Sequence, residues 1–203
     1  MLIGLTGAYC AGKNYIASLL EARKLPVLDV DKLGYQALEA EKGTIFAQFG
    51  ADLQKPDGSL DRRLLGQRVF GNPEKLAALE GIVHPPTNRL TDEWIASQNG
   101  SCVINAALLH RSSAFNRLDR VIVVTAPFLT RLLRAKRRDR LKLREILKRF
   151  ASQKDFDTQY LSINAEIYIV ENPGLSCGSG GGFGSRNLQK LERRLDKILE
   201  GIS

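Results

Sequence analysis

A glycine-rich turn near the start of the chain, GAYCAGKN, limits the fold more than any other stretch. Gly7, Gly12 and Lys13 keep the spacing G-x-x-x-x-G-K of a phosphate-binding loop. The apolar run LIGLT at 2–6 precedes it and predicts a buried strand, and apolar residues at helical spacing follow it to about Arg23. Because the loop joins a strand to a helix, it predicts a site where backbone N–H groups bind phosphate. A turn that merely capped a helix would need no lysine in this register.

Asn14 departs from the usual form of this motif. The residue after Lys13 is ordinarily Ser or Thr, whose hydroxyl helps to hold Mg²⁺. An amide carbonyl also binds Mg²⁺, but it is neutral and sits on a longer arm, so we expect weaker binding than with a hydroxyl or a carboxylate. The loop therefore predicts a nucleotide site whose metal is held differently.

Four further apolar runs predict the rest of a β-sheet. They are LPVLDV at 25–30, CVINAALL at 102–109, RVIVVTAP at 120–127 and AEIYIVEN at 165–172. Because these β-branched runs alternate with helical stretches, we expect five parallel strands covered on both faces. An amphipathic helix is expected at 187–202, and the low-complexity segment SCGSGGGFGS at 176–185 is expected to be a flexible loop.

About seventy residues, at 32–101, separate the second expected strand from the third. They are mostly helical in pattern, with a turn at PDGS, 56–59, and they are too long for a simple crossover. We therefore expect an inserted subdomain. Asp29 and Asp31 precede it, at a strand end where α/β proteins bind ligands. A carboxylate there could accept the proton of an alcohol during phosphoryl transfer. The structural alternative is that Asp31 caps the next helix.

The positive charge of the chain is concentrated in one segment. The chain has 30 Lys and Arg against 22 Asp and Glu. Ten of these bases and two of these acids lie at 131–149, so that segment carries the whole excess of eight. Such a block attracts polyanions, either nucleotide phosphates or nucleic acid. The stretch around it, 128–153, has apolar residues at helical spacing and is expected to be helical.

The composition argues against several other classes of protein. Three widely spaced cysteines, Cys10, Cys102 and Cys177, give neither a disulfide framework nor a C-x-x-C pair. With two histidines in the chain, a zinc site is not expected. No apolar run reaches the length of a membrane span, and the first residues lack the pattern of a signal peptide. We expect a cytoplasmic protein that does not use a membrane.

Several motifs follow one another in the order typical of one enzyme family. The phosphate loop and the Asp-x-Asp at 29–31 come first. The later motifs are FGADLQKPDGSLDRRLL at 49–65, VFGNPEKLAALEGIVHP at 69–85, RLLRAKRRD at 131–139, RFASQ at 149–153 and AEIYIVEN at 165–172. In this order they resemble the dephospho-coenzyme A kinases, over roughly residues 1–172.

The resemblance implies an α/β fold, with a P-loop kinase core of five parallel strands, a helical substrate-binding insertion and a basic helical lid. The core would comprise 1–31, 101–127 and 163–203, the coenzyme A-binding insertion 32–100, and the lid 128–162. The implied reaction is the ATP-dependent phosphorylation of the 3′-hydroxyl of dephospho-coenzyme A, the last step of coenzyme A synthesis. Mg²⁺ with ATP is the implied cofactor.

The resemblance also implies roles for individual residues in the transfer. Asp31 would be the base at the 3′-hydroxyl, and Lys13 would hold the ATP phosphates. Arg134 and Arg138, one helical turn apart, would close over the transferred phosphoryl group. The loop residues implied to bind ATP are Gly7, Cys10, Ala11, Gly12, Lys13, Asn14 and Tyr15.

Further implied residues concern the acceptor and the metal. Arg149 would act with the lid arginines on the substrate. His84 and Pro85 begin a segment implied to line the coenzyme pocket, and a purely structural histidine is the alternative for His84. Asn14 and Asn105 occupy the two positions closest in role to Mg²⁺ ligation.

The chain departs from the family pattern mainly where metal ligands are expected. Asn14 takes the place of a Ser, and Asn105 that of an Asp. Tyr15 replaces a hydroxyl residue, Tyr35 an Arg or His, Ala107 a Pro and Arg111 a Glu. Two alternatives follow: a nucleotide- or nucleic-acid-binding homologue with weakened catalysis, or a kinase of another small nucleotide. The basic segment lacks interleaved aromatic residues, so the expected partners are ATP and dephospho-coenzyme A rather than nucleic acid. The oligomeric state stays open.

Overall fold

The chain forms two compact units. The computed structural model describes residues 1–139, 142–151, 164–173 and 183–200. The core unit combines Met1–Leu28 with Gln98–Ser203, and the helical unit is Asp29–Ser97. Each unit is described by itself.

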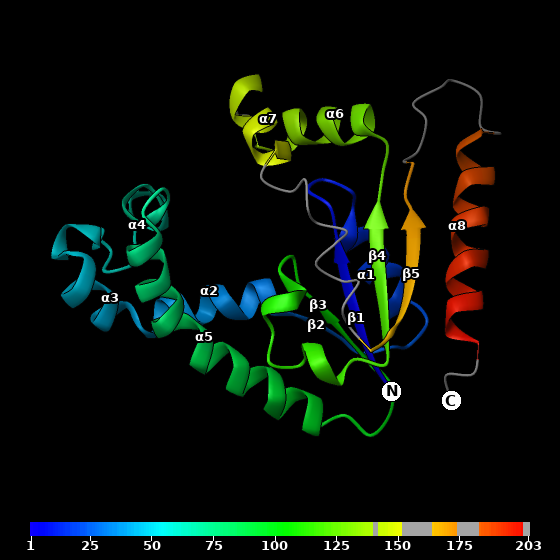
Figure 1. The fold of residues 1–203 in the computed structure, drawn as a ribbon, viewed down its shortest axis with the longest axis horizontal. Helices are drawn as coiled ribbons and strands as arrows, with labels where there is room; N and C mark the ends of the chain where they lie inside the picture. The colour runs from blue at the N-terminus through cyan, green and yellow to red at the C-terminus, as the bar shows by residue number, and fades with distance from the viewer. Residues whose placement is uncertain (140–141, 152–163, 174–182, 201–203) are drawn as a thin grey trace. The chain divides into compact units, whose positions relative to one another are not determined.

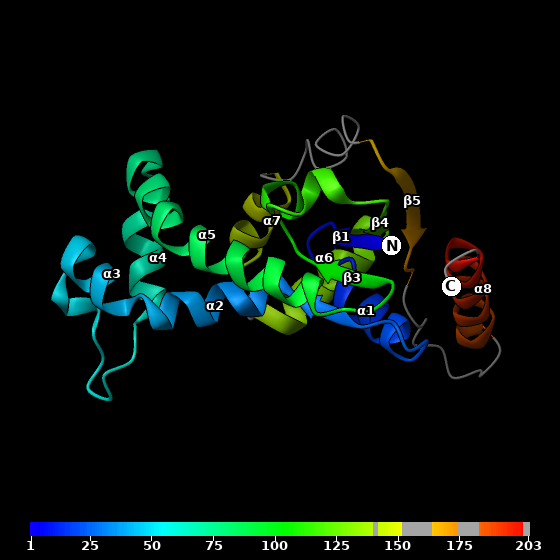
Figure 2. The same cartoon turned by 90° about the horizontal axis from the view of Figure 1, so that it is seen from below.

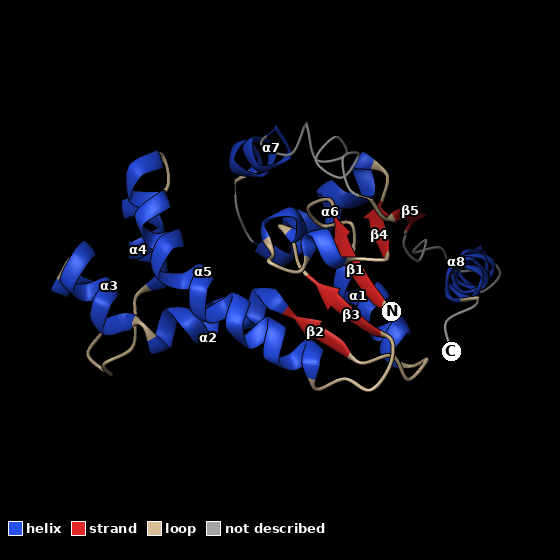
Figure 3. Ribbon diagram, turned by 60° about the horizontal axis from the view of Figure 1, so that its bottom comes forward, coloured by secondary structure: helices blue, strands red, loops and turns tan. Residues whose placement is uncertain are grey.

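A five-stranded parallel sheet forms the centre of the core unit, as the sequence predicted. Its strands are β1 (Leu2–Gly7), β2 (Val27–Asp29), β3 (Cys102–Asn105), β4 (Arg120–Thr125) and β5 (Glu166–Glu171). They lie in the order β2-β3-β1-β4-β5, which can be followed across Figure 3. The register places Leu5 of β1 opposite Asn105 of β3 and Thr6 opposite Val123 of β4. The first strand is therefore the central one, and the loop that follows it begins at the carboxyl end of that central strand.

Two of the expected strands cover only half of their apolar runs. The run at 102–109 leaves the sheet at Asn105, and the short 3₁₀ helix η2 follows at Leu109–Arg111. Leu109 is fully buried because it lies over the sheet: a side chain at Gly4 would collide with Leu109 and with Leu118. The second half of this run is thus hydrophobic because it packs against the face of the sheet, and not because the strand continues. In the same way, β2 covers three residues of the run at 25–30.

Helices α1 (Lys13–Glu21) and α8 (Phe183–Leu199) pack on one face of the sheet. Their buried side chains form one cluster with alternate residues of the strands, such as Ile3 and Leu5. The helical residues in this cluster are Ile16, Ala17, Leu20, Leu191, Leu195 and Ile198. Figures 1 and 2 both show α8 beside β5. The opposite face is covered by η2 and by η3 (Phe115–Arg117), where Gly4 admits Leu109 and Leu118.

The expected loop at 176–185 is partly wrong. Helix α8 begins at Phe183, so the last three residues of that segment are helical rather than loop. The rest of the glycine tract lies outside the described residues. The physical reason is that a helix needs few strong formers in its first turn once the following residues carry an apolar stripe.

The basic stretch folds into two helices, α6 (Phe128–Asp139) and α7 (Leu143–Ala151). Figure 1 shows β4 leading directly into α6. Both helices are strongly amphipathic, and each buries one side chain fully, Ala135 in α6 and Ile146 in α7. Over these two ranges the helical pattern expected for 128–153 is confirmed, and residues 140–141 and 152–153 of that stretch lie outside the described residues.

The helical unit contains α2 (Val30–Ala40), α3 (Lys42–Phe49), α4 (Arg62–Val69), α5 (Pro73–Ala96) and the short 3₁₀ helix η1 (Ala51–Leu53). Asp61 and Asn72 cap α4 and α5 by accepting hydrogen bonds from the backbone of the first turn. The predicted turn is present, with Gly58 at φ 78° and Asp57 accepting from the Ser59 N–H at 2.9 Å. A cluster including Ile45, Leu53, Leu60 and Leu65 forms the core of the unit.

No helix in the described part of the chain is both long and apolar enough to cross a lipid bilayer.

Candidate functional site

The loop after β1 has the geometry of a phosphate cradle. Gly7 lies so close to β4 that a side chain would collide with the Val124 carbonyl, and the Ala8 N–H donates to that same oxygen at 3.1 Å. Cys10 and Gly12 both have positive φ, 60° and 94°, which turns the backbone inward. Helix α1 then starts at Lys13, and no side chain among the described residues caps it. A helix start of this kind favours an anion, because the positive end of the helix dipole lies there.

Asn172, the residue after β5, secures this loop and was missed in the sequence analysis. Its Nδ2 donates to the Ala11 carbonyl at 2.9 Å, and its own backbone N–H donates to Thr125 at 2.8 Å. Only 5% of Asn172 is exposed. A side chain at Gly12 would collide with Asn172 Nδ2, so the glycine allows the two segments to approach. The signal was available, because Asn172 closes the last motif shared with the kinase family.

Arg134 of α6 binds the same stretch of loop together with Asn172. Its Nη1 donates to the Ala11 carbonyl at 2.9 Å and to the Cys10 carbonyl at 3.4 Å, and its Nη2 donates to Asn172 at 3.4 Å. Burial lowers the pKa of the Arg134 guanidinium from its ordinary value. Arginine side chains start from a pKa so high that they stay protonated in proteins at neutral pH. The residue therefore carries a full positive charge beside the phosphate loop.

A pocket of about 490 Å³ opens between the loop and α6. It is lined by Cys10, Gly12, Arg134, Arg137 and Arg138. Three guanidinium groups at a glycine loop make this an electropositive pocket suited to a chain of phosphates. Burial raises the pKa of the Cys10 thiol and outweighs the nearby arginines, so at neutral pH the thiol stays protonated.

Arg138 and Arg149 meet on one carboxylate, that of Asp139. Arg138 Nε donates to Asp139 Oδ1 at 2.6 Å, and Arg149 Nη1 donates to Oδ2 at 3.2 Å. The Tyr9 hydroxyl, at the tip of the phosphate loop, also donates to Asp139 Oδ2. Tyr9 and Asp139 were not among the predicted site residues. Asp139 explains why two predicted arginines, Arg138 and Arg149, lie close together, because both donate to its carboxylate.

Asn14 and Asn105 lie side by side on the opposite flank of the loop. Asn105 ends β3 and is 2% exposed, and its Nδ2 donates to Asn14 Oδ1 at 3.4 Å. The Asn105 Oδ1 atom is buried without a hydrogen-bond partner among the residues that the structure describes. A buried carbonyl oxygen without a partner is costly, and it is the kind of ligand that Mg²⁺ takes. The donor set therefore fits the metal, through two neutral amides.

The two acids at the start of α2 occupy different positions in the helix. Asp29 is the N-cap of α2, since its Oδ1 accepts from the Lys32 N–H at 3.1 Å. Asp31 lies in the first turn of the helix and is exposed to solvent. The alternative in which Asp31 caps this helix is thus wrong, because Asp29 already fills that position. Tyr35, one turn further on, is exposed and receives the Arg62 guanidinium 4.8 Å from its ring centre.

His84 and Pro85 lie inside the long helix α5. His84 is half-buried and Pro85 is exposed. Pro85 and Pro86 remove two backbone donors from the helix, and the Thr87 hydroxyl donates to the Val83 carbonyl at 2.7 Å in the same turn.

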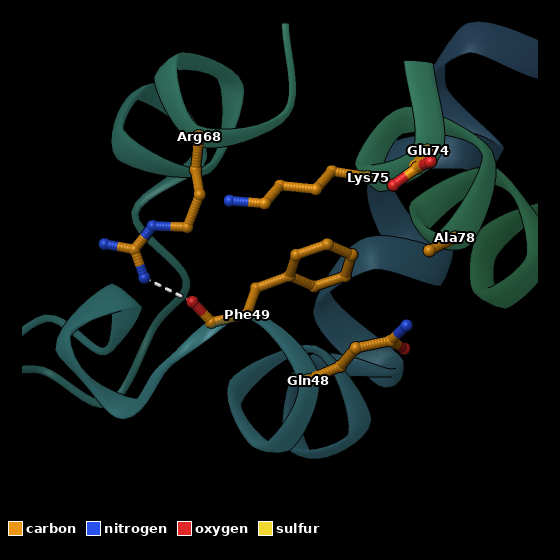
Figure 4. A pocket seen from close by; sticks show the side chains of 6 residues that line it. All are labelled: Gln48, Phe49, Arg68, Glu74, Lys75 and Ala78. Atoms are coloured by element: carbon orange, nitrogen blue, oxygen red, sulfur yellow. Dashed lines mark hydrogen bonds between the residues drawn. The ribbon is translucent and has the colours of Figure 1, made fainter. Parts of the chain in front are cut away.

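A separate pocket of about 290 Å³ lies near the start of α5, between α3, α4 and α5. Figure 4 shows the six residues that line it: Gln48, Phe49, Arg68, Glu74, Lys75 and Ala78. Lys75 extends over the Phe49 ring toward Arg68. Arg68 itself is held by the Phe49 carbonyl and by both oxygens of Asp52, at 2.9 and 2.5 Å. His84 and Pro85 are not part of this lining.

The structure thus brings most of the predicted residues together. The loop from Gly7 to Tyr15, the arginines at 134, 138 and 149 and the amide of Asn105 all belong to the core unit. Asp31, His84 and Pro85 belong to the helical unit, so their part in the site stays a prediction.

Comparison with known proteins places this site in a family. A family model described as dephospho-CoA kinase matches residues 1–175. The dephospho-CoA kinase of Treponema pallidum is 33% identical over 209 residues, covering 98% of this chain and 93% of that protein. The enzyme of that name from Anaeromyxobacter dehalogenans is 37% identical over 182 residues, covering 85% and 84%.

Solved structures agree with this placement. A crystal structure from Thermus thermophilus superposes with a TM-score of 0.80 at 31% identity, covering 100% of this chain and 98% of that one. Shikimate kinase from Bacteroides thetaiotaomicron, at 14% identity and a TM-score of 0.54 with 98% of each chain covered, shares the fold. The match over residues 1–175, the near-complete coverage of relatives above 30% identity and the phosphate-loop site together show that this chain belongs to the dephospho-CoA kinase family.

Proposed function

We propose that this chain transfers the γ-phosphoryl group of ATP to the 3′-hydroxyl of dephospho-coenzyme A, giving coenzyme A and ADP. The observation that carries the proposal is the pocket between the phosphate loop and α6, in which three arginines face a helix start that no described side chain caps. Both substrates would be small nucleotides of the cytoplasm, and neither nucleic acid nor a membrane takes part.

The first part of the mechanism is phosphate binding by the loop. The backbone N–H groups from Cys10 to Tyr15 would hold the ATP phosphates at the start of α1, where the helix dipole also favours an anion. Lys13, as the first residue of α1, would reach the β- and γ-phosphates. Because Asn172 and Arg134 already hold the loop in shape, little reorganisation is needed when ATP arrives.

The second part is stabilisation of charge on the phosphoryl group in flight. Arg134 and Arg138 both line the pocket, and Arg149 shares Asp139 with Arg138. Guanidinium groups placed there would bind the equatorial oxygens more strongly as the transition state develops. We assign residues 128–162 to a lid that excludes water from the reaction and so limits hydrolysis of ATP.

Proton transfer falls to Asp31. As the 3′-oxygen bonds to the γ-phosphorus and the bond to the ADP oxygen breaks, the hydroxyl proton would pass to the Asp31 carboxylate. Asp31 is exposed to solvent in the first turn of α2, and the capping bond of that helix is made by Asp29. The insertion at 32–100, with His84 and Pro85, would bind the rest of dephospho-coenzyme A.

Asn14 and Asn105 would hold the metal. The buried Oδ1 of Asn105 has no other partner among the described residues, and Asn14 lies next to it. Mg²⁺, when bound with ATP, would neutralise part of the phosphate charge. Since both side chains are neutral, we expect the ATP phosphates themselves to contribute most of the negative charge around the ion.

A coupled assay of ADP release with ATP, Mg²⁺ and dephospho-coenzyme A tests the proposal. We expect Asp31→Asn to lower kcat by about 10²- to 10⁴-fold without changing the urea midpoint. Glu93→Gln, which removes an exposed ion pair with Arg89, serves as the control and should keep full activity. Retained activity in Asp31→Asn would refute the base assignment.

A second candidate rests on the two amides at the metal site. If the chain binds ATP but shows no turnover at high Mg²⁺, it is a nucleotide-binding homologue rather than a kinase. Turnover with another nucleoside or nucleotide acceptor, and none with dephospho-coenzyme A, would instead show that the chain is a kinase of another small nucleotide.

A further inference from the structure

We propose that Tyr9, at the tip of the phosphate loop, is a positioning residue that holds Arg138 and Arg149 over the nucleotide pocket through the carboxylate of Asp139. The inference deepens the proposed function, on which it rests for its kinetic consequence. It concerns a side chain that the phosphate-loop motif leaves unspecified.

Hydrogen bonds join the four residues into one cluster. The Tyr9 hydroxyl donates to Asp139 Oδ2, and Arg138 spans the same carboxylate with Nε at 2.6 Å and Nη2 at 3.2 Å. Arg149 Nη1 donates both to Asp139 Oδ2 at 3.2 Å and to the Tyr9 oxygen at 3.3 Å. The Asp139 side chain is 15% exposed. Its two oxygens are thus shared among donors from the loop, α6 and α7.

The Tyr9 ring adds a second set of contacts to the same two arginines. The guanidinium carbon of Arg138 lies 5.2 Å from the ring centre, and that of Arg149 lies 5.6 Å from it. Both distances are within the range of cation–π attraction. The Tyr9 ring therefore contacts both arginines, and the Tyr9 hydroxyl also contacts Arg149.

Phe150 and Arg131 fix the position of Tyr9 itself. Phe150 of α7 meets the Tyr9 ring edge-on at 5.6 Å, with an angle of 75° between the ring planes. Arg131 of α6 stacks on Phe150 at 4.6 Å and donates from Nε to the Tyr9 backbone carbonyl at 2.9 Å. The tip of the phosphate loop is therefore held between two helices.

Electrostatics explains why two arginines need such a partner. Two guanidinium groups in one place repel each other, and the Asp139 carboxylate cancels one of the two charges. Hydrogen bonding to Arg138 holds the pKa of Asp139 below its usual value, so the group is ionised at neutral pH. Burial, together with the bond to Asp139, raises the pKa of Tyr9, so its hydroxyl stays protonated and can donate.

The cluster of Arg138, Arg149 and Asp139 carries one net positive charge, and its member Arg138 lines the pocket beside the loop. Tyr9 acts through these arginines and need not touch the phosphoryl group. Its loss should therefore affect kcat, which depends on the arginines in the transition state, more than the KM for ATP, which depends on the loop and Lys13.

The chain contains a matched control with the same chemistry elsewhere. Tyr168 on β5 donates its hydroxyl to Glu166 Oε2 at 2.8 Å, and Arg120 bonds that oxygen at 3.0 Å. The Arg120 guanidinium also lies 5.8 Å from the Tyr168 ring centre. This cluster has no part in the proposed site, so Tyr168→Phe removes an equivalent hydroxyl without touching the arginines of the pocket.

The deciding experiment measures backbone amide hydrogen exchange in α6 and α7 without any ligand. Tyr9→Phe, which keeps the ring, should raise exchange in α7 by about threefold, and Tyr9→Leu by about tenfold, since bonds to charged groups and ring contacts are lost. Tyr168→Phe should leave α7 unchanged. Wild-type exchange in α7 of Tyr9→Leu would overturn the inference, and a thermal melt shows whether each variant is folded.

Steady-state kinetics then distinguish a residue that positions the arginines from one that only stabilises the fold. We expect kcat of Tyr9→Phe to fall by about tenfold while the KM for ATP stays within about twofold. A fall in the apparent ATP affinity with kcat unchanged would overturn the positioning role. Absence of turnover in the wild type would refute the proposed function instead, whereas the exchange comparison, made without substrates, would still decide whether Tyr9 holds the arginines.

Discussion

The two flanks of the phosphate loop are built in opposite ways. On the flank facing α6, the Tyr9 hydroxyl and both carboxylate oxygens of Asp139 take part in hydrogen bonds, and Arg138 donates through Nε and Nη2. On the flank facing β3, Asn105 and Asn14 share one weak contact at 3.4 Å, and the Asn105 carbonyl oxygen is buried without a partner among the described residues. The charged groups of the first flank are therefore paired within the protein, whereas the second flank keeps a buried acceptor that no described residue bonds.

The difference follows from the charges on each side. Arginines crowded at a pocket repel one another, so a stable arrangement requires a carboxylate and hydrogen bonds before any phosphate is present. Neutral amides do not repel, and an unpartnered carbonyl costs about 1–3 kcal/mol, which a folded protein can tolerate. The cationic flank is therefore set in advance, whereas the amide flank keeps a buried carbonyl oxygen that, under the proposed function, would bind the metal that accompanies ATP.

The largest effect is expected from Gly12→Ala, which disturbs the completed flank. A side chain there would collide with Asn172 Nδ2, and the φ of 94° is unfavourable for alanine. We expect kcat/KM to fall by about 10³-fold, because misplaced donors lose most of their effect on the transition state. Steady-state kinetics and ATP titration calorimetry measure the change.

Gly100→Ala is the matched control for that substitution, because a side chain at Gly100 meets no atom within 4 Å. It should behave as wild type. Normal ATP affinity in Gly12→Ala would show that the contact between the loop and Asn172 is dispensable.

A smaller effect is expected on the amide flank from Asn105→Asp. A carboxylate in place of the buried amide should lower the Mg²⁺ concentration for half-maximal rate by about tenfold, because carboxylates bind this ion more strongly. In the absence of metal the variant should be less stable, since burial disfavours a charged carboxylate. Thermal melting with and without Mg²⁺ and ATP measures this without relying on turnover.

Asn14→Ser provides a second step on the same flank. Because Asn14 is exposed, this change should lower the Mg²⁺ requirement by less than Asn105→Asp does. An unchanged or higher requirement in both variants would show that the amides are no handicap, and it would remove the contrast between the flanks.

The smallest effect concerns the pH dependence of the completed flank. The pKa of Asp139 is held low by Arg138, so its contribution to stability is present above the ordinary carboxyl range and is lost as pH falls through the lowered value. At pH 7 we expect Asp139→Asn to be less stable than wild type by about 1 kcal/mol, and the gap should close below about pH 4. Urea midpoints between pH 3 and 7 give the comparison.

Glu166→Gln breaks the equivalent cluster on β5 and should show a weaker dependence, since its carboxylate is largely exposed. An equal pH dependence in both variants would mean that the cluster at the loop is no more ordered than a surface ion pair.

How far the sequence predicts this molecule depends on the distance between interacting residues. The residues that define the phosphate loop are close together in the sequence. Gly7, Gly12 and Lys13 lie in one short segment, and the strand before them is a single apolar run. The parallel sheet follows from the same kind of pattern. The strand at 102–109 was overestimated because Leu109 is buried by packing against Gly4, and hydrophobicity does not separate the two causes.

The contacts that complete the site could not be predicted in this way. Tyr9 and Asp139 are 130 positions apart, and Asn172 and Ala11 are 161 apart. Neither Tyr9 nor Asp139 belongs to a pattern of spacing, so their pairing appears only when α6 lies beside the loop. Asp29 likewise took the capping role from Asp31 because α2 begins one residue after the strand ends.

Asn172 has a consequence for the order in which the chain is made. The phosphate loop leaves the ribosome well before Asn172, because 161 positions separate Ala11 from the amide that bonds it. While those residues are made, the protein carries the whole nucleotide motif without the side chain that secures it. A chain that stops short of this residue would retain every letter of the motif and lose the tie that shapes it.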